Sequence, residues 1–376
     1  MDYIPYGTQV IEEDDIAAVA EVLRSGYLTT GPKVAEFEEA FAASAGAKYA
    51  VAVSNGTAAL HLAMLAAGVG EGDEALVSPL TFAASSNCAL YVGAKPVFVD
   101  IDSDTLLTDM ESLRSRVTEN TRAIVAVNYG GEVCDLDTLA EIAGERGLTL
   151  IQDCAHSLGS KYKGKLSGMY SGMQTWSLHP VKTITTGEGG VVTTNDEALA
   201  GKLRLLRTHG ITRDESLFED ANEGGWYYEM QSLGYNYRMT DIQCALGLSQ
   251  LKKLERFAAR RAEIVARYDR EFEGLPLRTQ LSPSWSEPVR HLYTIRLDDK
   301  SRRREVFDAL KAKGIGVNVH YKPVYLMPYY RNLGYAAGLC PNAEDAYERM
   351  VTLPLHAGMA DEQVEYVAGA VRDLVE

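Results

Sequence analysis

One lysine in this sequence stands where an amine could react with a carbonyl compound. Lys182 follows the apolar run Gln174–Leu178 and enters the turn 183–190, which is rich in glycine. A glycine-rich turn after a strand leaves room for a ligand beside the amine, and lysines in such surroundings form Schiff bases when their pKa is lowered. A single lysine is more often a solvated surface charge, so its meaning depends on the residues around it.

A carboxylate closes another apolar run in a way that suggests a cationic partner. Asp153 ends the run Leu148–Asp153 and is followed three residues later by His156. A carboxylate at the end of a buried strand is costly unless it meets a cation or several donors. Asp153 could simply cap the turn. A protonated pyridine nitrogen is the partner that would make its position functional.

Two further segments could bind a phosphate and a flat ring. Gly56 and Thr57 lie between the predicted strand Tyr49–Val53 and a predicted helix, where free N–H groups favour a phosphate, although ordinary helix capping is the simpler explanation. Phe82 follows a predicted strand and could stack on a ring, although most such residues are core. A phosphate-binding turn, an aromatic ring, an aspartate and a lysine are together the contacts that pyridoxal phosphate requires.

The elements that would position these residues alternate between strands and helices. Short apolar runs separated by amphipathic helices predict a largely parallel sheet covered on both faces. The predicted strands are Tyr49–Val53, Ala75–Ser78, Pro96–Asp100, Arg122–Asn128, Leu148–Asp153, Gln174–Leu178 and Gly190–Thr194; the predicted helices are Glu12–Ser25, Lys33–Ala43, Gly56–Ala67, Phe82–Val92, Asp109–Arg116 and Leu136–Arg146. In such sheets ligands bind at the carboxyl ends of the strands.

The second part of the chain predicts a smaller α/β domain. One long helix, Asp241–Phe272, leads into it, so we expect a large domain over 1–245 and a small one over 246–376. Its predicted strands are His291–Leu297 and Gly316–His320, and its predicted helices are Arg302–Lys313, Asn342–Val351 and Asp361–Val375.

Composition excludes several classes of protein. Among 376 residues, 37 Lys and Arg stand against 52 Asp and Glu, a formal charge of −15 that argues against a nucleic-acid binder. Runs long enough for a membrane helix and a signal peptide are both missing, so we expect a cytoplasmic protein. The five cysteines form no C-x-x-C pair, and we expect no metal site. A nicotinamide-binding glycine fingerprint is missing as well.

Four motifs together resemble one family. They are Ser25–Pro32, Asp153-x-Ala-His156, the segment from Ser177 to Gly190, and Leu233–Met239. The chain resembles the fold-type-I pyridoxal-phosphate aminotransferases of the DegT/DnrJ/EryC1/StrS type, which act on nucleotide-linked keto sugars. Within that family, Ile4–Gly7 and Val319–Pro323 are similar to the C4 aminotransferases of the pseudaminic acid pathway.

The resemblance implies a role for each matching residue. Lys182 would be joined to the cofactor and would carry the proton, Asp153 would hold the ring nitrogen protonated, and His156 would contact the ring. The phosphate would be bound by Gly56, Thr57, Ser177 and, from a neighbouring subunit, Asn236, which makes a homodimer part of the site; Phe82 would stack on the ring. The sugar-nucleotide cleft would be lined by Tyr6, Gly26, Tyr27, Leu28, Thr29, His320, Tyr321, Lys322 and Pro323, with Arg238 inferred to bind the diphosphate or the donor carboxylate.

The implied reaction moves an amino group from L-glutamate to C4 of a UDP-linked 4-keto-6-deoxy-N-acetylhexosamine, ping-pong through pyridoxamine phosphate. A C3 or C4 aminotransferase for another UDP-, GDP- or dTDP-linked keto sugar is an alternative. A non-catalytic binding protein is a more distant one, since Asp153 and Lys182 are both present. We expect His61 to be a core or boundary residue and Trp226–Tyr228 to be a packed loop.

Overall fold

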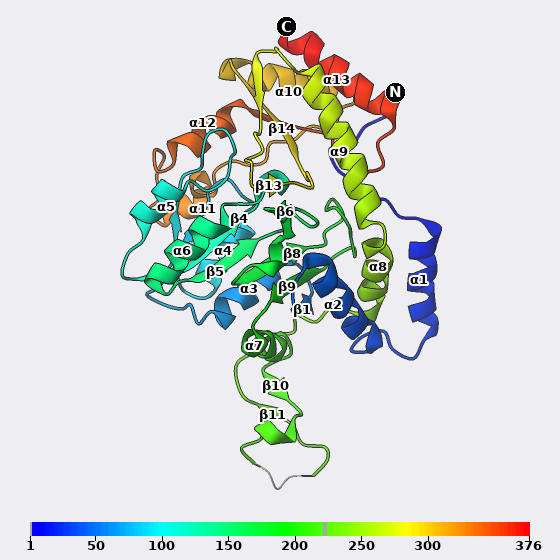
Figure 1. Ribbon diagram of the computed structural model, residues 1–376, viewed down its shortest axis with the longest axis vertical. Helices are drawn as coiled ribbons and strands as arrows, with labels where there is room; N and C mark the ends of the chain where they lie inside the picture. Colours follow the sequence, from blue (N-terminus) through cyan, green and yellow to red (C-terminus); the bar gives the residue numbers. More distant parts are fainter. Residues whose placement is uncertain (1, 221–223) are drawn as a thin grey trace.

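The large domain is built on a seven-stranded sheet, shown in the computed structural model of Figure 1, which describes residues 2–220 and 224–376. The strand order is β1-β9-β8-β5-β4-β2-β3, and β9 runs in the direction opposite to the other six strands. The strands are β1 Tyr49–Val53, β2 Glu74–Val77, β3 Lys95–Phe98, β4 Thr121–Val127, β5 Thr149–Asp153, β8 Met173–Ser177 and β9 Gly190–Thr194. All seven predicted strands are confirmed, with ends shifted by at most two residues, because their apolar runs are buried on both faces.

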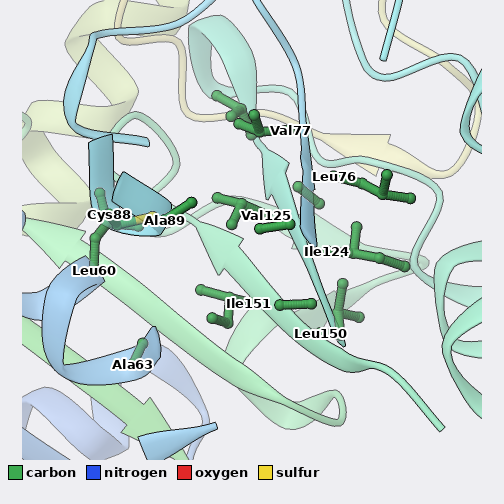
Figure 2. Close-up of a cluster of buried hydrophobic side chains, with 14 of the residues drawn as sticks. Leu60, Ala63, Leu76, Val77, Cys88, Ala89, Ile124, Val125, Leu150 and Ile151 are labelled. Carbon is green, nitrogen blue, oxygen red and sulfur yellow. The ribbon is translucent and has the colours of Figure 1, made fainter. Parts of the chain in front are cut away.

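Helices cover both faces of this sheet. They are α2 Pro32–Ala45, α3 Gly56–Ala66, α4 Ala84–Tyr91, α5 Met110–Arg116, α6 Leu136–Arg146 and α7 Glu197–Arg207. The first helix, α1 Glu13–Arg24, packs instead on the helix that begins at Asp241. One core joins α3 and α4 to the strands, and Figure 2 shows Leu60 and Cys88 beside Val125 and Ile151. A second core contains Phe37 of α2 and Trp176 of β8. The sheet is therefore held rigidly between two apolar layers, which fixes the positions of its strand ends.

The predicted helix Asp241–Phe272 is wrong in one respect, because it is two helices. They are α8, Asp241–Leu251, and α9, Leu254–Glu271. At the break, the ammonium group of Lys253 lies 2.7 Å from the buried carboxylate of Asp15 and 2.6 Å from Asp14. This ion cluster anchors the turn against α1, and the chain then changes direction toward the small domain.

The small domain has its own sheet and core. Its sheet order is β12-β14-β15, with β12 Leu277–Thr279, β14 Tyr293–Leu297 and β15 Met350–Leu353, and its core includes α10 Arg303–Ala312 and α13 Asp361–Val375. Two further helices, α11 Pro328–Asn332 and α12 Pro341–Arg349, place Tyr330 and Ala343 in the core of the large sheet instead. The predicted strand Gly316–His320 is reduced to one bridge between Asn318 and Thr352, and the predicted helix Asn342–Val351 ends two residues early because β15 begins at once. Ile4 packs in the core of the small domain, so the amino-terminal segment lies beside that domain.

A projecting hairpin, here called the arm (residues 208–220 and 224–236), extends away from the body below α7 (Figure 1). It contains β10, Ile211–Thr212, and β11, Glu229–Met230. Trp226–Tyr228 was predicted to be a packed loop. This prediction is wrong for the single chain, because the Trp226 side chain is 77% exposed. The remaining short strands are β6 Lys161–Tyr162, β7 Lys165–Leu166 and β13 Ser286–Glu287. Among the described residues, the helices are all too short or too polar to cross a membrane.

Candidate active site

A cavity of about 1190 Å³ opens at the carboxyl end of the large sheet. Its walls come from the turns after β1, β2, β5 and β8 and from the segment 318–321. Ten of the predicted site residues line it: Tyr6, Gly56, Thr57, Phe82, Asp153, His156, Ser177, Lys182, His320 and Tyr321. The parallel strands bring these residues together because their carboxyl ends share one edge.

The lysine lies in an environment that favours its neutral form. Burial lowers the pKa of Lys182 to about 8, and the charge of Arg261 acts in the same direction, while Asp153 opposes the shift. Burial disfavours the charged form of an amine, so a larger share of Lys182 is nucleophilic near neutral pH than for an exposed lysine. This is the property that Schiff-base formation requires.

The carboxylate of Asp153 is 7% exposed and is held on both oxygens. Oδ1 accepts a hydrogen bond from the backbone N–H of Ala155 at 3.0 Å, so the turn-capping role is present on this oxygen. Oδ2 accepts from the Ser85 hydroxyl at 2.6 Å. Within residues 2–220 and 224–376, Asp153 has no cationic side chain within salt-bridge distance, which leaves the carboxylate open to a cationic ligand in the cavity.

The start of α3 has the shape and the donors of a phosphate site. Asn55 caps the helix by accepting from the N–H of Ala58 at 2.8 Å. Gly56 and Thr57 follow in the first turn, where N–H groups have no partner within a helix and the dipole favours an anion. Ser177 lies opposite, and a Cβ at Gly56 would come within 3.0 Å of its Cβ. Asn55 thus provides the cap, and the first-turn N–H groups of Gly56 and Thr57 stay available to an anion.

The imidazole ring of His156 is neutral, and each of its two nitrogens has a hydrogen-bond partner in this cavity. The Gly130 N–H donates to Nδ1 at 3.4 Å, which leaves the proton on Nε2, 3.3 Å from the Tyr321 hydroxyl. Burial and the nearby charge of Lys182 hold the pKa of His156 well below its usual value. The ring also lies 4.6 Å from His291, which is buried beneath it. Hydrogen bonds to Gly130 and Tyr321, and not an ion pair, therefore fix the orientation of the His156 ring.

The cavity wall includes residues that the sequence analysis missed. His61 is buried, as predicted, but it also lines the cavity, where its Nδ1 lies 3.2 Å from the Tyr237 hydroxyl. Ser85, Tyr91 and Tyr235 line the same cavity. His61, Ser85 and Tyr91 carry no distinctive spacing, because the packing of α3 and α4 brings them to the site, whereas Tyr235 lies within the motif Leu233–Met239.

Eight predicted site residues lie outside the wall that a single chain forms. They are Gly26, Tyr27, Leu28, Thr29, Asn236, Arg238, Lys322 and Pro323. Backbone bridges join Thr29 to Thr240, Asn236 to Thr208 and Arg238 to Val53. Their predicted roles toward the substrate or a neighbouring subunit's phosphate stay predictions.

Comparison with known proteins gives matches over the full length. The DegT/DnrJ/EryC1/StrS aminotransferase family matches residues 9–372. The spore coat polysaccharide biosynthesis protein SpsC of Bacillus subtilis is 42% identical over 380 residues, covering 100% of this chain and 97% of that protein. Helicobacter pylori PseC, an aminotransferase of pseudaminic acid biosynthesis, is 33% identical, with a TM-score of 0.91 and coverage of 100% and 99%.

A further structural relative identifies the cofactor. Streptococcus pneumoniae Spr1654 is 34% identical with a TM-score of 0.93, covers 99% of each chain in its PMP form, and is also known in a PLP form. The predicted fold class, an α/β fold-type-I transferase, and the predicted cofactor, pyridoxal 5′-phosphate, are both confirmed. With its full-length family match and its cavity, this chain belongs to the DegT/DnrJ/EryC1/StrS aminotransferase family, whose members are sugar aminotransferases.

Proposed function

We propose that this protein transfers an amino group from L-glutamate to C4 of a UDP-linked 4-keto-6-deoxy-N-acetylhexosamine, as in pseudaminic acid synthesis. The observation that carries the chemistry is one cavity that joins Lys182, Asp153 and the start of α3. The similarity to PseC over the whole chain supports the sugar. The greater identity to SpsC keeps other polysaccharide sugars as the alternative.

The residues present fit the cofactor. The first turn of α3 with Ser177 offers donors for a phosphate, and the buried Asp153 carboxylate offers an anion for a protonated ring nitrogen. Phe82 is 62% exposed although it lines the cavity, so its ring is free to stack. When bound, pyridoxal phosphate supplies a ring that withdraws electrons from the carbon bearing the amine.

The chain itself would bind, orient and move a proton. The Lys182 amine would take a proton from Cα of glutamate and return one at C4 of the acceptor sugar. His156 and Tyr321 would hold the ring from one side through their mutual contact. Tyr6 and His320, whose ring centroids are 5.2 Å apart, would border the sugar.

The same proposal includes a homodimer with shared sites and a two-step, ping-pong reaction. Asn236 ends the arm, where Trp226 and Leu233 are exposed and could pack on a second copy. The Gly26–Thr29 segment, Arg238 and the Lys322–Pro323 pair would contact the nucleotide or the donor at that junction. We also propose a cytoplasmic location, since all five cysteines are free and buried, as is usual in a reducing compartment.

A half-reaction followed by visible absorbance tests the proposal. Protein loaded with cofactor is treated with L-glutamate, cleared of donor, and mixed with UDP-4-keto-6-deoxy-β-L-AltNAc. We expect the absorbance of the lysine-bound cofactor to disappear with glutamate and to return with the sugar, whereas the variant Lys182→Ala should do neither. A response to glutamate without return would keep the aminotransferase and reject this sugar, so UDP D-sugars and GDP- or dTDP-linked ketones would follow.

A further inference from the structure

A chain of two hydroxyl groups ends on the carboxylate of Asp153, the residue proposed to pair with the cofactor's ring nitrogen. Thr81 Oγ1 lies 2.7 Å from Ser85 Oγ, and Ser85 Oγ lies 2.6 Å from Asp153 Oδ2. All three residues are buried, with exposed fractions of 3%, 1% and 7%. Water therefore competes little for these hydrogen bonds, and their loss would leave the carboxylate underbonded.

The direction of this chain follows from the number of hydrogens. An ionised carboxylate only accepts, so the single hydroxyl hydrogen of Ser85 points to Asp153. The Phe82 carbonyl is a weaker competitor, since it is neutral and 3.2 Å away. Thr81 must then donate to the free lone pair of Ser85. Both hydroxyls are consequently oriented toward Asp153.

The two hydroxyls do not come from a strand next to the one that carries Asp153. In the sheet order β5-β4-β2, the strand that carries Asp153 is separated from β2 by one strand. The turn after β2 carries Thr81 and Phe82, and Ser85 follows in the first turn of α4. One short segment thus holds both the aromatic ring proposed to stack on the cofactor and the donor to its carboxylate.

We infer that Ser85, oriented by Thr81, is a positioning residue that holds the Asp153 carboxylate in place for the cofactor's ring nitrogen and thereby keeps that nitrogen protonated. The inference rests on the role of Asp153 in the proposed function. A hydrogen bond donated to the charged form of a carboxylate favours that form. Without it, the carboxylate of Asp153 keeps only the hydrogen bond from the Ala155 N–H, and its pairing with the ring nitrogen is weakened.

The experiment compares Ser85→Ala with Ser86→Ala, a matched loss of a buried hydroxyl on the same turn. Ser86 bonds Tyr330 at 2.8 Å and the Ala83 carbonyl at 3.1 Å. The readouts are the dissociation constant for pyridoxal phosphate and the ¹⁵N chemical shift of its labelled ring nitrogen. Ser85→Ala should weaken binding roughly ten- to hundredfold and move the shift toward the neutral nitrogen. Ser86→Ala should change neither, and Ser85→Thr should restore both.

Equal values for Ser85→Ala and Ser86→Ala would overturn the inference. If Ser85→Ala does not fold, Thr81→Val provides the second test, with a smaller shift in the same direction expected and an unchanged shift overturning the inference. The variant Asp153→Asn distinguishes the role of Asp153 from the role of the two hydroxyl groups. An unchanged ring-nitrogen shift in Asp153→Asn would reject the assignment of Asp153 and this inference with it, whereas a large change there, with none in Ser85→Ala, would reject the hydroxyl chain alone.

Discussion

The buried centre of the cavity and the exposed arm differ in how far a single chain satisfies their side chains. Around the centre, Asp153 and His156 are buried, and their polar atoms have partners from the same chain. In the arm, the described residues between 211 and 236 include none that is buried, and Trp226 and Leu233 are 77% and 76% exposed. The centre can be assembled by one subunit, whereas the arm's apolar surface points to a partner. Four experiments test this difference between the centre and the arm.

The largest effect is expected for Lys182→Ala. The substitution removes both the covalent anchor and the group that moves the proton, so transamination should fall by roughly a hundred- to ten-thousandfold. Borohydride reduction followed by mass spectrometry should find cofactor attached to the native chain and none attached to the variant. Covalent cofactor in Lys182→Ala would contradict the assignment of the centre.

Asn236→Ala tests whether the arm completes a neighbouring site. Loss of a hydrogen bond to the charged phosphate should weaken cofactor binding roughly ten- to hundredfold. If the residue acts across subunits, mixing and re-forming dimers from Asn236→Ala and Lys182→Ala should restore activity, up to roughly a quarter of the native value for random pairing in a two-fold dimer. Absence of restoration, in a mixture shown to contain hybrid dimers, would place Asn236 in its own chain's site.

The pH dependence of cofactor capture probes the centre alone. With the pKa of Lys182 lowered to about 8, its reactive neutral amine is depleted as the pH falls below that value. Capture of pyridoxal phosphate by the apoprotein should therefore slow by about tenfold per pH unit below 8 and level off above it. Nearby His156 and His320 stay neutral across this range, because burial and the charge of Lys182 lower the pKa of both. Stopped-flow absorbance measures the rate, and a break near the ordinary lysine pKa would contradict the buried environment.

The smallest effect on folding is expected in the arm. Trp226→Ala removes an exposed ring, so the free energy of unfolding of the isolated subunit should change by no more than about 0.5 kcal/mol. The dimer dissociation constant should rise roughly tenfold or more if the ring packs on a partner, as measured by sedimentation. An unchanged constant would remove Trp226 from the interface. Arg304→Ala, on the exposed start of α10, provides a control for a surface side chain.

Several features were predictable because they depend on local pattern. The apolar runs and the glycine-rich turn after β8 identified the sheet and placed Lys182 and Asp153 at strand ends. The break between α8 and α9 was not predictable, since it depends on Lys253 meeting carboxylates that lie more than 200 residues away in the sequence. The exposure of Trp226 was missed for a related reason, because composition does not say whether an apolar residue packs within its own chain or on another.

The succession of strands and helices along the chain, and the types of side chain at the site, could be predicted from the sequence alone. Periodicity and strand-end polarity are local properties, so they can be recognised without knowledge of contacts. The hydroxyl that bonds Asp153 could be identified only from the folded chain, since Ser85 is 68 residues away and lies in α4, which no sequence pattern links to β5. The tertiary structure also decided that His61, buried as expected, borders the cavity. Such pairings depend on how the helices pack on the twisted sheet, and that packing is a property of the whole chain.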